Sequence, residues 1–526
     1  MNKILPLIVL FLFTYLLSAC SALPEISYKS KKRVGSQATS LEFSKEQECY
    51  FEKLHADYYQ TLSPACEKQV FYPSQDGNQL IAVLEINEQG RFIQKPHIRH
   101  VLEKVWEIRQ THDTAVTLFV HGWNHGGQLN DSDLHNYRET LNNLYNEKSA
   151  RFNKKNIGIY IAWRGKTMPS ALNYTTFWNR KNISVNIGKG DLGAFILDLE
   201  RFTKLEVDSG KKATLVLGGH SFGASALYNA LGPILISRFQ DSITQQQILA
   251  HQKNDFPVPI QGVGDLVLLI NPAIEAKQFY PLRETIWRHA SRHKEQDPKI
   301  FQHNLKPLFV VLGSNGDFAV NNLFPAGRWL NTLTQNYDKT NIVNGNGLAC
   351  EHENCVTDPK VDKFCASGED CFIPENILDR HAIGNFSWFY THWLTSSLDP
   401  IVSFNPVKTL NNINHATEMQ KTAEPQCTSK TGWLENVKVK NNNWEEEIGS
   451  LNSEINLKLS TRRMNDNWKS YGLSFKDEPE HTTNAQSTTW YRNPYWFVRV
   501  NSKVIPGHSE IWNLQVGCFI LSIVDI

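Results

Sequence analysis

Short apolar runs recur along the chain, and segments with apolar residues three or four positions apart lie between them. Unbroken runs of this length predict strands that are buried on both faces of a sheet. The predicted strands are Val116–Val120, Ile157–Trp163, Thr214–Leu217, Asp265–Ile270, Pro307–Leu312 and Tyr495–Val500. The predicted helices are Ile98–Arg109, Leu134–Leu144, Leu192–Phe202 and a helix that starts at Ala224–Ala230. This alternation predicts an α/β fold with a mostly parallel sheet and helices on both faces.

One predicted strand, Thr214–Leu217, runs into a turn with an unusual arrangement of glycines around a serine. The pattern Gly219-x-Ser221-x-Gly223 is that of a nucleophile elbow, a sharp turn that exposes a serine hydroxyl above a sheet. A serine becomes a good nucleophile when a histidine accepts its proton, and the resulting oxyanion needs backbone N–H donors. We expect one of these donors to be the N–H of Phe222, the residue after the serine.

A second strand, Val116–Val120, ends in His121-Gly122-Trp123 about a hundred residues before the elbow. With these two strand ends in this order, the chain resembles the α/β-hydrolase family. In that family a histidine-glycine pair opens the loop that supplies the second oxyanion donor. The resemblance implies that this donor is the backbone N–H of Trp123.

The resemblance also implies where the acid of a catalytic triad lies. In the family the acid follows a late strand, after the serine and before the histidine. Asp317 fits this position, because it follows the predicted strand Pro307–Leu312. Glu275, after the preceding strand, is the alternative. Asp317 could also simply close a Ser-Asn-Gly-Asp turn, a common place for these residue types.

Three histidines compete for the role of the base. His381 precedes Phe386–Leu394, an aromatic stretch that we predict to be helical and that also carries His392. His508 lies between the predicted strand Tyr495–Val500 and an apolar closing segment, Leu514–Val524. The family fold ends with a strand, a loop that carries the histidine and a helix, so the resemblance favours His508 over His381. His392 ranks third because a histidine within a helix usually packs against its neighbours.

A base at His508 makes 341–489 a long insertion between the last two strands. We therefore expect 41–340 to form an α/β-hydrolase core, 341–489 a cysteine-containing insertion or lid, and 490–526 the final strand, histidine loop and closing helix. Before this core, we expect residues 1–19 to form a signal peptide and 20–40 a tether. If His381 were the base, residues after about 400 would instead form a separate β-rich module. Long insertions near an active site often act as lids or docking surfaces.

The N-terminal segment has the features of a secretory signal. A lysine at position 3 precedes an apolar run from Ile4 to Leu17, and small residues precede Cys20. Leu17-Ser18-Ala19-Cys20 resembles the lipobox of bacterial lipoproteins, which implies cleavage before Cys20, acylation of that cysteine and a lipid anchor in the cell envelope. Ser21 at the next position favours the outer membrane. A plain signal peptide or an uncleaved membrane anchor are the alternatives.

Eight further cysteines are expected to form disulfides in an oxidising compartment. Cys49 and Cys66 flank a short segment and are expected to pair. The group Cys350, Cys355, Cys365 and Cys371 matches no zinc-binding spacing, so two local disulfides are favoured over a metal site. Cys427 and Cys518 are left to pair, unless Cys518 is a buried thiol.

Composition adds little to this interpretation. The chain has 526 residues, of which 41% are hydrophobic and 20% charged, and its net charge is +1. These values are typical of a globular protein and give no indication of a nucleic-acid partner. The sequence predicts a serine hydrolase, anchored in the envelope, that cleaves carboxylic esters without a cofactor or metal, with lipid esters as one candidate class of substrate. A binding or structural lipoprotein that keeps this fold without turnover is the alternative, and the oligomeric state stays open.

Overall fold

The computed structural model describes residues 71–73, 79–127, 131–141, 154–167, 176–252, 258–291, 301, 304, 306–337, 375–386, 389–396, 447–452, 457–461 and 493–524. The predictions for the signal peptide, the tether and Cys20 lie outside these residues, as do those for every other cysteine except Cys518. Cys518 is disulfide-bonded, so the alternative of a buried thiol is wrong. Its expected partner, Cys427, also lies outside the described residues.

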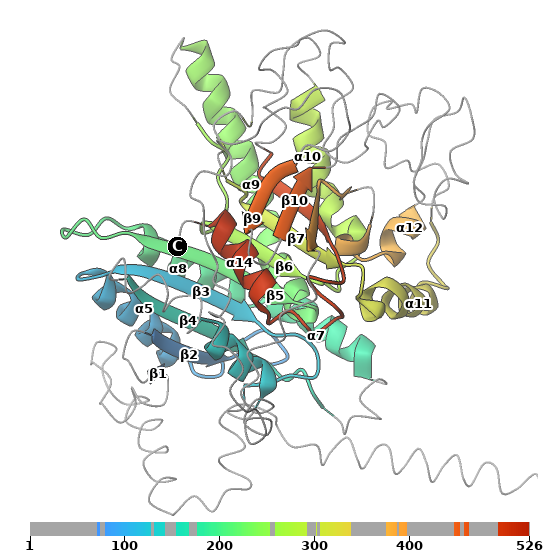
Figure 1. Cartoon of the computed structure of the whole chain (residues 1–526), viewed down its shortest axis with the longest axis horizontal. Coiled ribbons are helices and arrows are strands. Elements are labelled where there is room, and N and C mark those ends of the chain that lie inside the picture. Colours follow the sequence, from blue (N-terminus) through green and yellow to red (C-terminus); the bar gives the residue numbers. More distant parts are fainter. Residues whose placement is uncertain are drawn as a thin grey trace, which may run out of the picture.

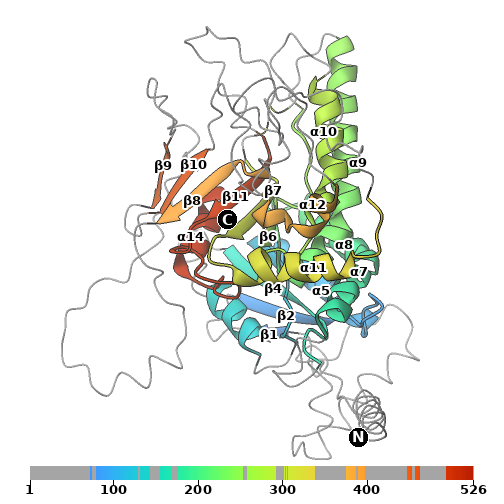
Figure 2. The ribbon, with the colours of Figure 1, turned by 90° about the vertical axis from the view of Figure 1, so that its right-hand side faces the viewer.

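The described strands form one eleven-stranded sheet (Figures 1 and 2). Eight neighbouring strands are parallel, in the order β2 (Gln79–Glu85), β4 (Lys154–Ala162), β3 (Asp113–Val120), β5 (Ala213–His220), β6 (Leu266–Ile270), β7 (Phe309–Ser314), β11 (Tyr495–Val500) and β8 (His392–Ser396). Antiparallel strands lie at the two edges: β1 (Phe71–Pro73) beside β2, and β10 (Leu457–Thr461) followed by β9 (Glu447–Asn452) beside β8. The predicted α/β class with a mostly parallel sheet is confirmed.

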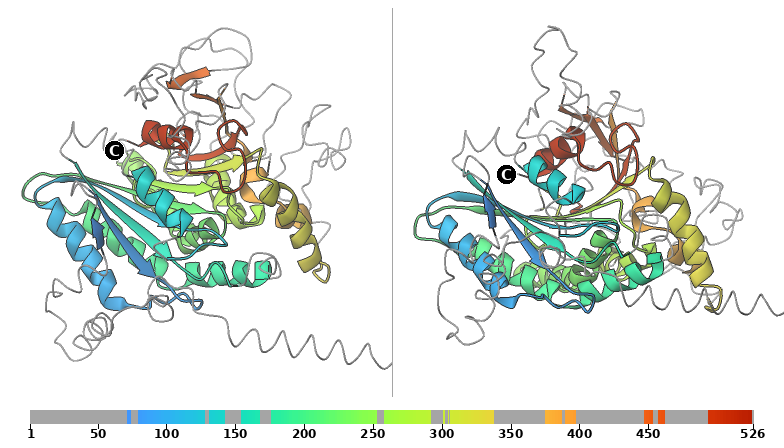
Figure 3. Two further views of the ribbon diagram at one scale, coloured as in Figure 1. Left: turned by 60° about the horizontal axis from the view of Figure 1, so that its bottom comes forward. Right: turned by 90° about the horizontal axis from the view of Figure 1, so that it is seen from below.

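Helices cover both faces of the sheet, as predicted (Figure 3). One face carries α5 (Lys95–Arg109), α7 (Phe177–Lys189), α8 (Leu192–Lys204), α9 (Phe222–His251) and α10 (Tyr280–Ser291). The other face carries a helix at 132–141 and α14 (Leu514–Ile523). Alternate side chains of each strand enter the two cores: Ile157, Ile159 and Ile161 face one, whereas Tyr160 and Ala162 face the other. The central strands are mostly apolar because both of their faces are buried.

Short elements connect the later strands. They are the 3₁₀ turn η2 (Ala276–Phe279), the π-helical turn η4 (Ala319–Leu323), α11 (Phe324–Asn331), α12 (Glu375–Arg380) and the 3₁₀ turn η6 (Ile383–Asn385). These elements come after β6 and β7 in the chain. β6 and β7 are parallel to β5, so their carboxyl ends lie at the same edge of the sheet as the serine turn that follows β5.

The prediction of a helix over Phe386–Leu394 is wrong. The chain forms η6 and then the strand β8, which pairs in parallel with β11 from His392↔Val498 to Leu394↔Val500. Aromatic and β-branched residues suit a pleated, buried surface, and the neighbouring β11 provides one. β8, β10 and β9 all come from the predicted insertion, so this part of the chain extends the sheet.

Sequence periodicity also missed α7, which packs directly against α9. Its buried residues include Arg180, Lys181 and Ser184, so its inward face does not read as an apolar stripe. Gly188 on α7 lies against the backbone of α9: a methyl group added there would be 2.4 Å from the Ala226 oxygen and 2.5 Å from the Asn229 Cβ. This close approach holds the helix that follows Ser221.

We predict that Gly188→Ala lowers the free energy of unfolding by about 1–3 kcal/mol, because the new methyl group overpacks the contact between α7 and α9. Gly193→Ala is the matched control. Gly193 lies in α8 and also faces α9, but there the added methyl group would be 3.4 Å from the Ala230 oxygen. The control should be neutral or stabilising by up to about 1 kcal/mol, since alanine favours a helix. Chemical denaturation of both variants measures the difference, and equal effects would contradict it.

Candidate active site

The turn between β5 and α9 holds Ser221 in a strained conformation. Ser221 has φ 54° and ψ −118°, in the positive-φ region that side-chain-bearing residues rarely adopt. Its N–H donates to the Ile270 carbonyl, and its own carbonyl accepts from the Ala273 and Ser225 N–H groups. Such strain costs about 1–3 kcal/mol and persists where neighbouring structure imposes it.

The two glycines of the pattern allow the close approach that imposes this strain. A methyl group on Gly223 would lie 2.0 Å from the Val120 oxygen and 2.4 Å from the His121 oxygen. One on Gly219 would lie 2.8 Å from the Ala224 Cα. Gly223 therefore lets the start of α9 touch the end of β3, and Gly219 lets β5 turn back against α9.

The structure brings Ser221, His508 and Asp317 together in a line. His508 Nε2 lies 2.8 Å from the Ser221 Oγ, and His508 Nδ1 lies 2.7 Å from the Asp317 Oδ2. A carboxylate accepts the Nδ1–H, so Nε2 is left as the acceptor for the serine hydroxyl. Asp317 is fully buried, and its other oxygen accepts the Val320 N–H at 2.9 Å. This arrangement suits a serine nucleophile, a histidine base and an orienting acid.

The loop that carries His508 is held by two residues that the sequence did not single out. Asn271 is the residue after β6 and has φ 43°. Its Nδ2 donates to the Gly507 and His508 carbonyls, at 3.1 Å in both cases. Its Oδ1 accepts the Ser314 N–H at 3.0 Å. His220 Nε2 donates to the His508 carbonyl at 2.8 Å. Burial and the nearby His508 lower the pKa of His220 well below its usual value, so this ring stays neutral.

The acid lies on a turn packed equally tightly against the same loop. Ser314 Oγ donates to the Ile505 carbonyl and accepts the Gly316 N–H. A methyl group on Gly316 would lie 2.0 Å from the Pro506 oxygen. Backbone contact between these two loops therefore sets the distance between Asp317 and His508.

The His-Gly loop after β3 lies beside the serine, as the predicted second oxyanion donor requires. A methyl group on Gly122 would be 3.1 Å from the Ser221 Cβ. His121 orients this loop: its Nε2 accepts the Trp163 N–H at 3.0 Å, so its Nδ1–H donates to the Gly122 carbonyl at 2.8 Å. Burial lowers the pKa of His121 to about 4, which keeps the ring neutral.

The two nominated N–H donors come from Phe222 and Trp123. Phe222 is the first residue of α9, where backbone N–H groups have no partner within the helix and where the helix dipole favours negative charge. Trp123 precedes a turn at Asn124 with φ 71°. The Trp123 and Phe222 rings lie 6.2 Å apart, and Phe177 of α7 packs against both at 5.4 and 5.0 Å. An apolar wall therefore surrounds the place where an oxyanion would form.

Asp131 and Asp133 together tie the His-Gly loop to the chain that follows His508. Asp131 accepts the Gly126 N–H at 2.9 Å and lies 3.1 Å from His125 Nδ1. Asp133, two residues later, accepts the Trp512 Nε1–H, and Trp512 follows the His508 loop. Burial alone would lower the pKa of His125, but the hydrogen bond that its ring donates to Asp131 and the charges of Asp133 and Asp131 raise it above its usual value.

The alternative acid and bases lie elsewhere. Glu275 pairs with Lys181 Nζ at 2.9 Å and with Arg328 Nε at 3.2 Å, in a buried cluster. His381 Nδ1 lies 2.8 Å from the Ile377 carbonyl. His392 of β8 packs on Trp496 of β11, and burial lowers the pKa of His392 to about 3. These residues are placed for structural roles, whereas His508 and Asp317 meet the serine.

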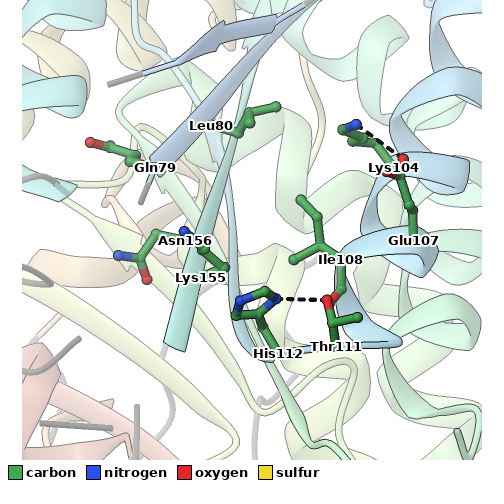
Figure 4. Close-up of a pocket in the computed structure, with 9 residues that line it drawn as sticks. All are labelled: Gln79, Leu80, Lys104, Glu107, Ile108, Thr111, His112, Lys155 and Asn156. Carbon is green, nitrogen blue, oxygen red and sulfur yellow. Dashed lines mark hydrogen bonds and ion pairs between the residues drawn. The ribbon is translucent and has the colours of Figure 1, made fainter. Parts of the chain in front are cut away.

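A cavity of about 280 Å³ lies at the opposite end of the sheet, between α5 and the beginnings of β2 and β4 (Figure 4). Leu80 and Ile108 line it. Four of its polar side chains form two pairs: Lys104 Nζ lies 3.0 Å from Glu107 Oε2, and Thr111 Oγ1 lies 2.7 Å from His112 Nδ1. Ser221 lies at the carboxyl ends of the strands, so this cavity belongs to no part of the serine site.

Among the described residues, no cluster of three or more His, Cys, Asp or Glu side chains is placed to hold a metal ion. Within the same residues, no helix combines the length and apolar character needed to cross a bilayer. No protein-family model, curated protein or solved structure matches this chain. The function is therefore inferred from the site itself.

Some residues that shape the site carry weak sequence signals. Asn271 is a polar residue at the end of an apolar strand and precedes a proline, which marks a special turn. His220 lies inside the glycine-serine pattern, where its identity is unconstrained. Asp133 and Trp512 lie far apart in the sequence, so no local pattern connects them.

We predict that Asp131→Asn lowers the free energy of unfolding by about 1–3 kcal/mol near pH 6, because it leaves the partly buried His125 poorly paired. The raised pKa of His125 contributes stability that is fully present below pH 6.5, the usual pKa of a histidine. This stability is lost as the pH rises through the pKa of His125 in the folded protein. The lowered pKa of Asp131 contributes stability that is fully present above pH 3.8, the usual pKa of an aspartate. This stability is lost as the pH falls through the pKa of Asp131 in the folded protein. The cost should therefore be smaller at about pH 9 than at pH 6.

Chemical denaturation at the two pH values measures this cost. Glu103→Gln is the control, because Glu103 pairs with Arg99 on the exposed face of α5. It should cost under about 0.5 kcal/mol at both pH values. A pH-independent cost for Asp131→Asn would contradict the ion pair.

Proposed function

We propose that this protein is a serine hydrolase of the α/β-hydrolase type that cleaves carboxylic esters. The line of hydrogen bonds from Asp317 through His508 to Ser221 is the observation that carries the proposal. It is supported by the strained turn at Ser221 and by the position of Ser221 at the carboxyl ends of the parallel strands, where open α/β sheets bind their ligands.

In the proposed acylation step, Ser221 Oγ attacks the ester carbonyl carbon while its proton passes to His508 Nε2. Asp317 keeps the imidazole oriented and stabilises the positive charge that forms on it. The carbonyl oxygen becomes an oxyanion, which the N–H groups of Phe222 and Trp123 stabilise. The bond to the alcohol oxygen then breaks, and His508 returns its proton to that oxygen as the alcohol leaves.

In the deacylation step, water takes the place of the alcohol. His508 Nε2 accepts a proton from the water as its oxygen attacks the acyl-serine. The tetrahedral intermediate collapses, the carboxylic acid leaves, and the proton returns to the Ser221 Oγ. The chain's own side chains supply every proton transfer in this scheme.

A lipid anchor at Cys20 and a place in the bacterial cell envelope, on the outer membrane, complete the proposal. They rest on the match of Leu17-Ser18-Ala19-Cys20 to the lipobox. A binding lipoprotein without turnover would not need a histidine aligned with both a serine and a buried carboxylate, so the geometry favours the enzyme.

We predict that a fluorophosphonate probe labels Ser221, because the activated hydroxyl attacks the phosphorus as it would a carbonyl carbon. Ser221→Ala should abolish labelling, and His508→Ala should slow it by about 10⁴-fold or more. His381→Ala is the control and should label at the rate of the wild type. Mass spectrometry of the labelled peptide identifies the site. A folded protein that stays unlabelled at Ser221 would reject the proposal.

A second pair of variants distinguishes the two candidate acids. Asp317→Asn should lower kcat for ester hydrolysis by about 10⁴-fold, because the imidazole loses its orienting acceptor. Glu275→Gln should instead lower the midpoint of thermal unfolding, because Lys181 and Arg328 would keep buried charges without their partner. Steady-state kinetics and thermal denaturation of both variants give the result. Loss of turnover in Glu275→Gln at a temperature where it stays folded would contradict this assignment.

A further inference from the structure

The segment from Phe318 to Leu333, called here the apolar segment, begins at the residue after Asp317 and comprises η4, α11 and the turn that follows. Five of its large hydrophobic side chains face solvent: Phe318 (64% exposed), Leu323 (48%), Trp329 (49%), Leu330 (60%) and Leu333 (58%). Of the other exposed large hydrophobics among the described residues, Leu197 and Leu205 lie eight positions apart, and Ile93 and Ile248 lie far from them along the chain. The concentration in one short segment marks a surface suited to binding.

The orientation of α11 is opposite to that of an ordinary surface helix. Arg328 points inward and is buried, with its guanidinium paired to Asp379 at 2.5 Å and to Glu275 at 3.2 Å. Gly327 lies against the Trp178 ring, where an added methyl group would be 2.6 Å from a ring carbon. These contacts fix the rotation of the helix and leave Trp329 and Leu330 facing outward. The exposure therefore follows from specific packing.

The apolar segment also lacks exposed charge. Between Asp317 and Asp338 the sequence contains one charged side chain, Arg328, and that one is buried in ion pairs. A surface with apolar, amide and hydroxyl groups loses little solvation when it enters a lipid interface, and tryptophan is favoured there. Protein-binding surfaces ordinarily carry a polar rim that includes charged groups, whereas the polar groups of this segment are amides and hydroxyls and its one charged side chain is buried.

Packed aromatic rings connect the apolar segment to the serine. Trp178, which contacts Gly327, packs against Phe177 at 5.0 Å. Phe177 in turn packs against Phe222, the neighbour of Ser221, at 5.0 Å. A continuous apolar path therefore runs from α11 to the proposed oxyanion site.

We propose that the apolar segment docks onto a lipid surface and delivers a lipid ester to Ser221. The choice of a lipid ester as substrate rests on the proposed hydrolase function, whereas the docking surface does not. The chain between Cys20 and Phe71 can span roughly 170 Å when extended, so a lipid anchor at Cys20 would leave the apolar segment able to reach the same bilayer.

The test uses the full chain reconstituted into vesicles of phosphatidylethanolamine and phosphatidylglycerol with brominated acyl chains, which quench tryptophan in contact with them. In the wild type the brominated lipids should quench more fluorescence than in Trp329→Phe, because Trp329 enters the bilayer. Equal quenching in the two proteins would overturn the docking, whatever the activity shows.

Kinetics test the delivery of the substrate. Leu330→Glu combined with Leu333→Glu should lower hydrolysis of a vesicle-embedded ester by about tenfold or more, since both leucines lose their favourable burial in lipid. Turnover of a water-soluble short-chain ester should stay within about twofold of the wild type. Ile248→Glu combined with Leu205→Glu is the matched control, because it adds the same charges at exposed apolar positions elsewhere. It should leave both activities unchanged.

The remaining outcomes separate the two proposals. If neither ester is hydrolysed, the hydrolase function fails, and the quenching experiment still decides the docking. If the leucine variant and its control hydrolyse the vesicle-embedded ester at the same rate, delivery of the substrate by this surface is overturned. If the leucine variant changes a dimer into a monomer in sedimentation and leaves the quenching unchanged, the surface binds a second copy and the lipid proposal is wrong.

Discussion

The contact between the start of α9 and the end of β3 is the constraint on which the rest of the site depends. Gly223 lies so close to the Val120 and His121 carbonyls that no side chain fits between them. The chain therefore turns sharply at Ser221 and takes a positive φ. This turn raises the serine above the sheet, points the first N–H of α9 towards the same space and places Gly122 against the serine. One backbone contact thus organises the nucleophile and both nominated oxyanion donors.

The histidine reaches this turn through strand pairing across a long sequence separation. β11 pairs with β7 over its whole length, so the loops that follow these two strands emerge side by side. Asn271 at the end of β6 hydrogen-bonds to both loops, through the His508 carbonyl on one side and the Ser314 N–H on the other. Three adjacent strands therefore set the positions of the base and the acid. The strained φ of Asn271 fits this role at the junction.

The buried ion pairs explain why Glu275, a candidate acid in the sequence, has a structural role instead. Glu275 holds Lys181 of α7 and Arg328 of α11 beneath the surface, and burial lowers the pKa of Lys181 against the pull of that carboxylate. Such pairs are costly to break and do not by themselves add much stability. Their effect here is geometric, because they turn the charged side of α11 inward and its apolar side outward.

The sequence by itself determined the alternating elements, the glycine-serine turn, the His-Gly loop and the candidate residues Asp317 and His508. These depend on local patterns: apolar runs, glycines that permit close backbone contact and residue types matched to a chemistry. The tertiary structure decided what depends on distant pairing. It placed His508 and not His381 beside Ser221, and it made the end of the expected helix Phe386–Leu394 the start of a strand beside β11. It also brought Asn271 and His220 against the His508 loop and Asp133 against Trp512. A side chain's partner across the fold has no fixed spacing in the sequence, so packing and strand pairing alone reveal it.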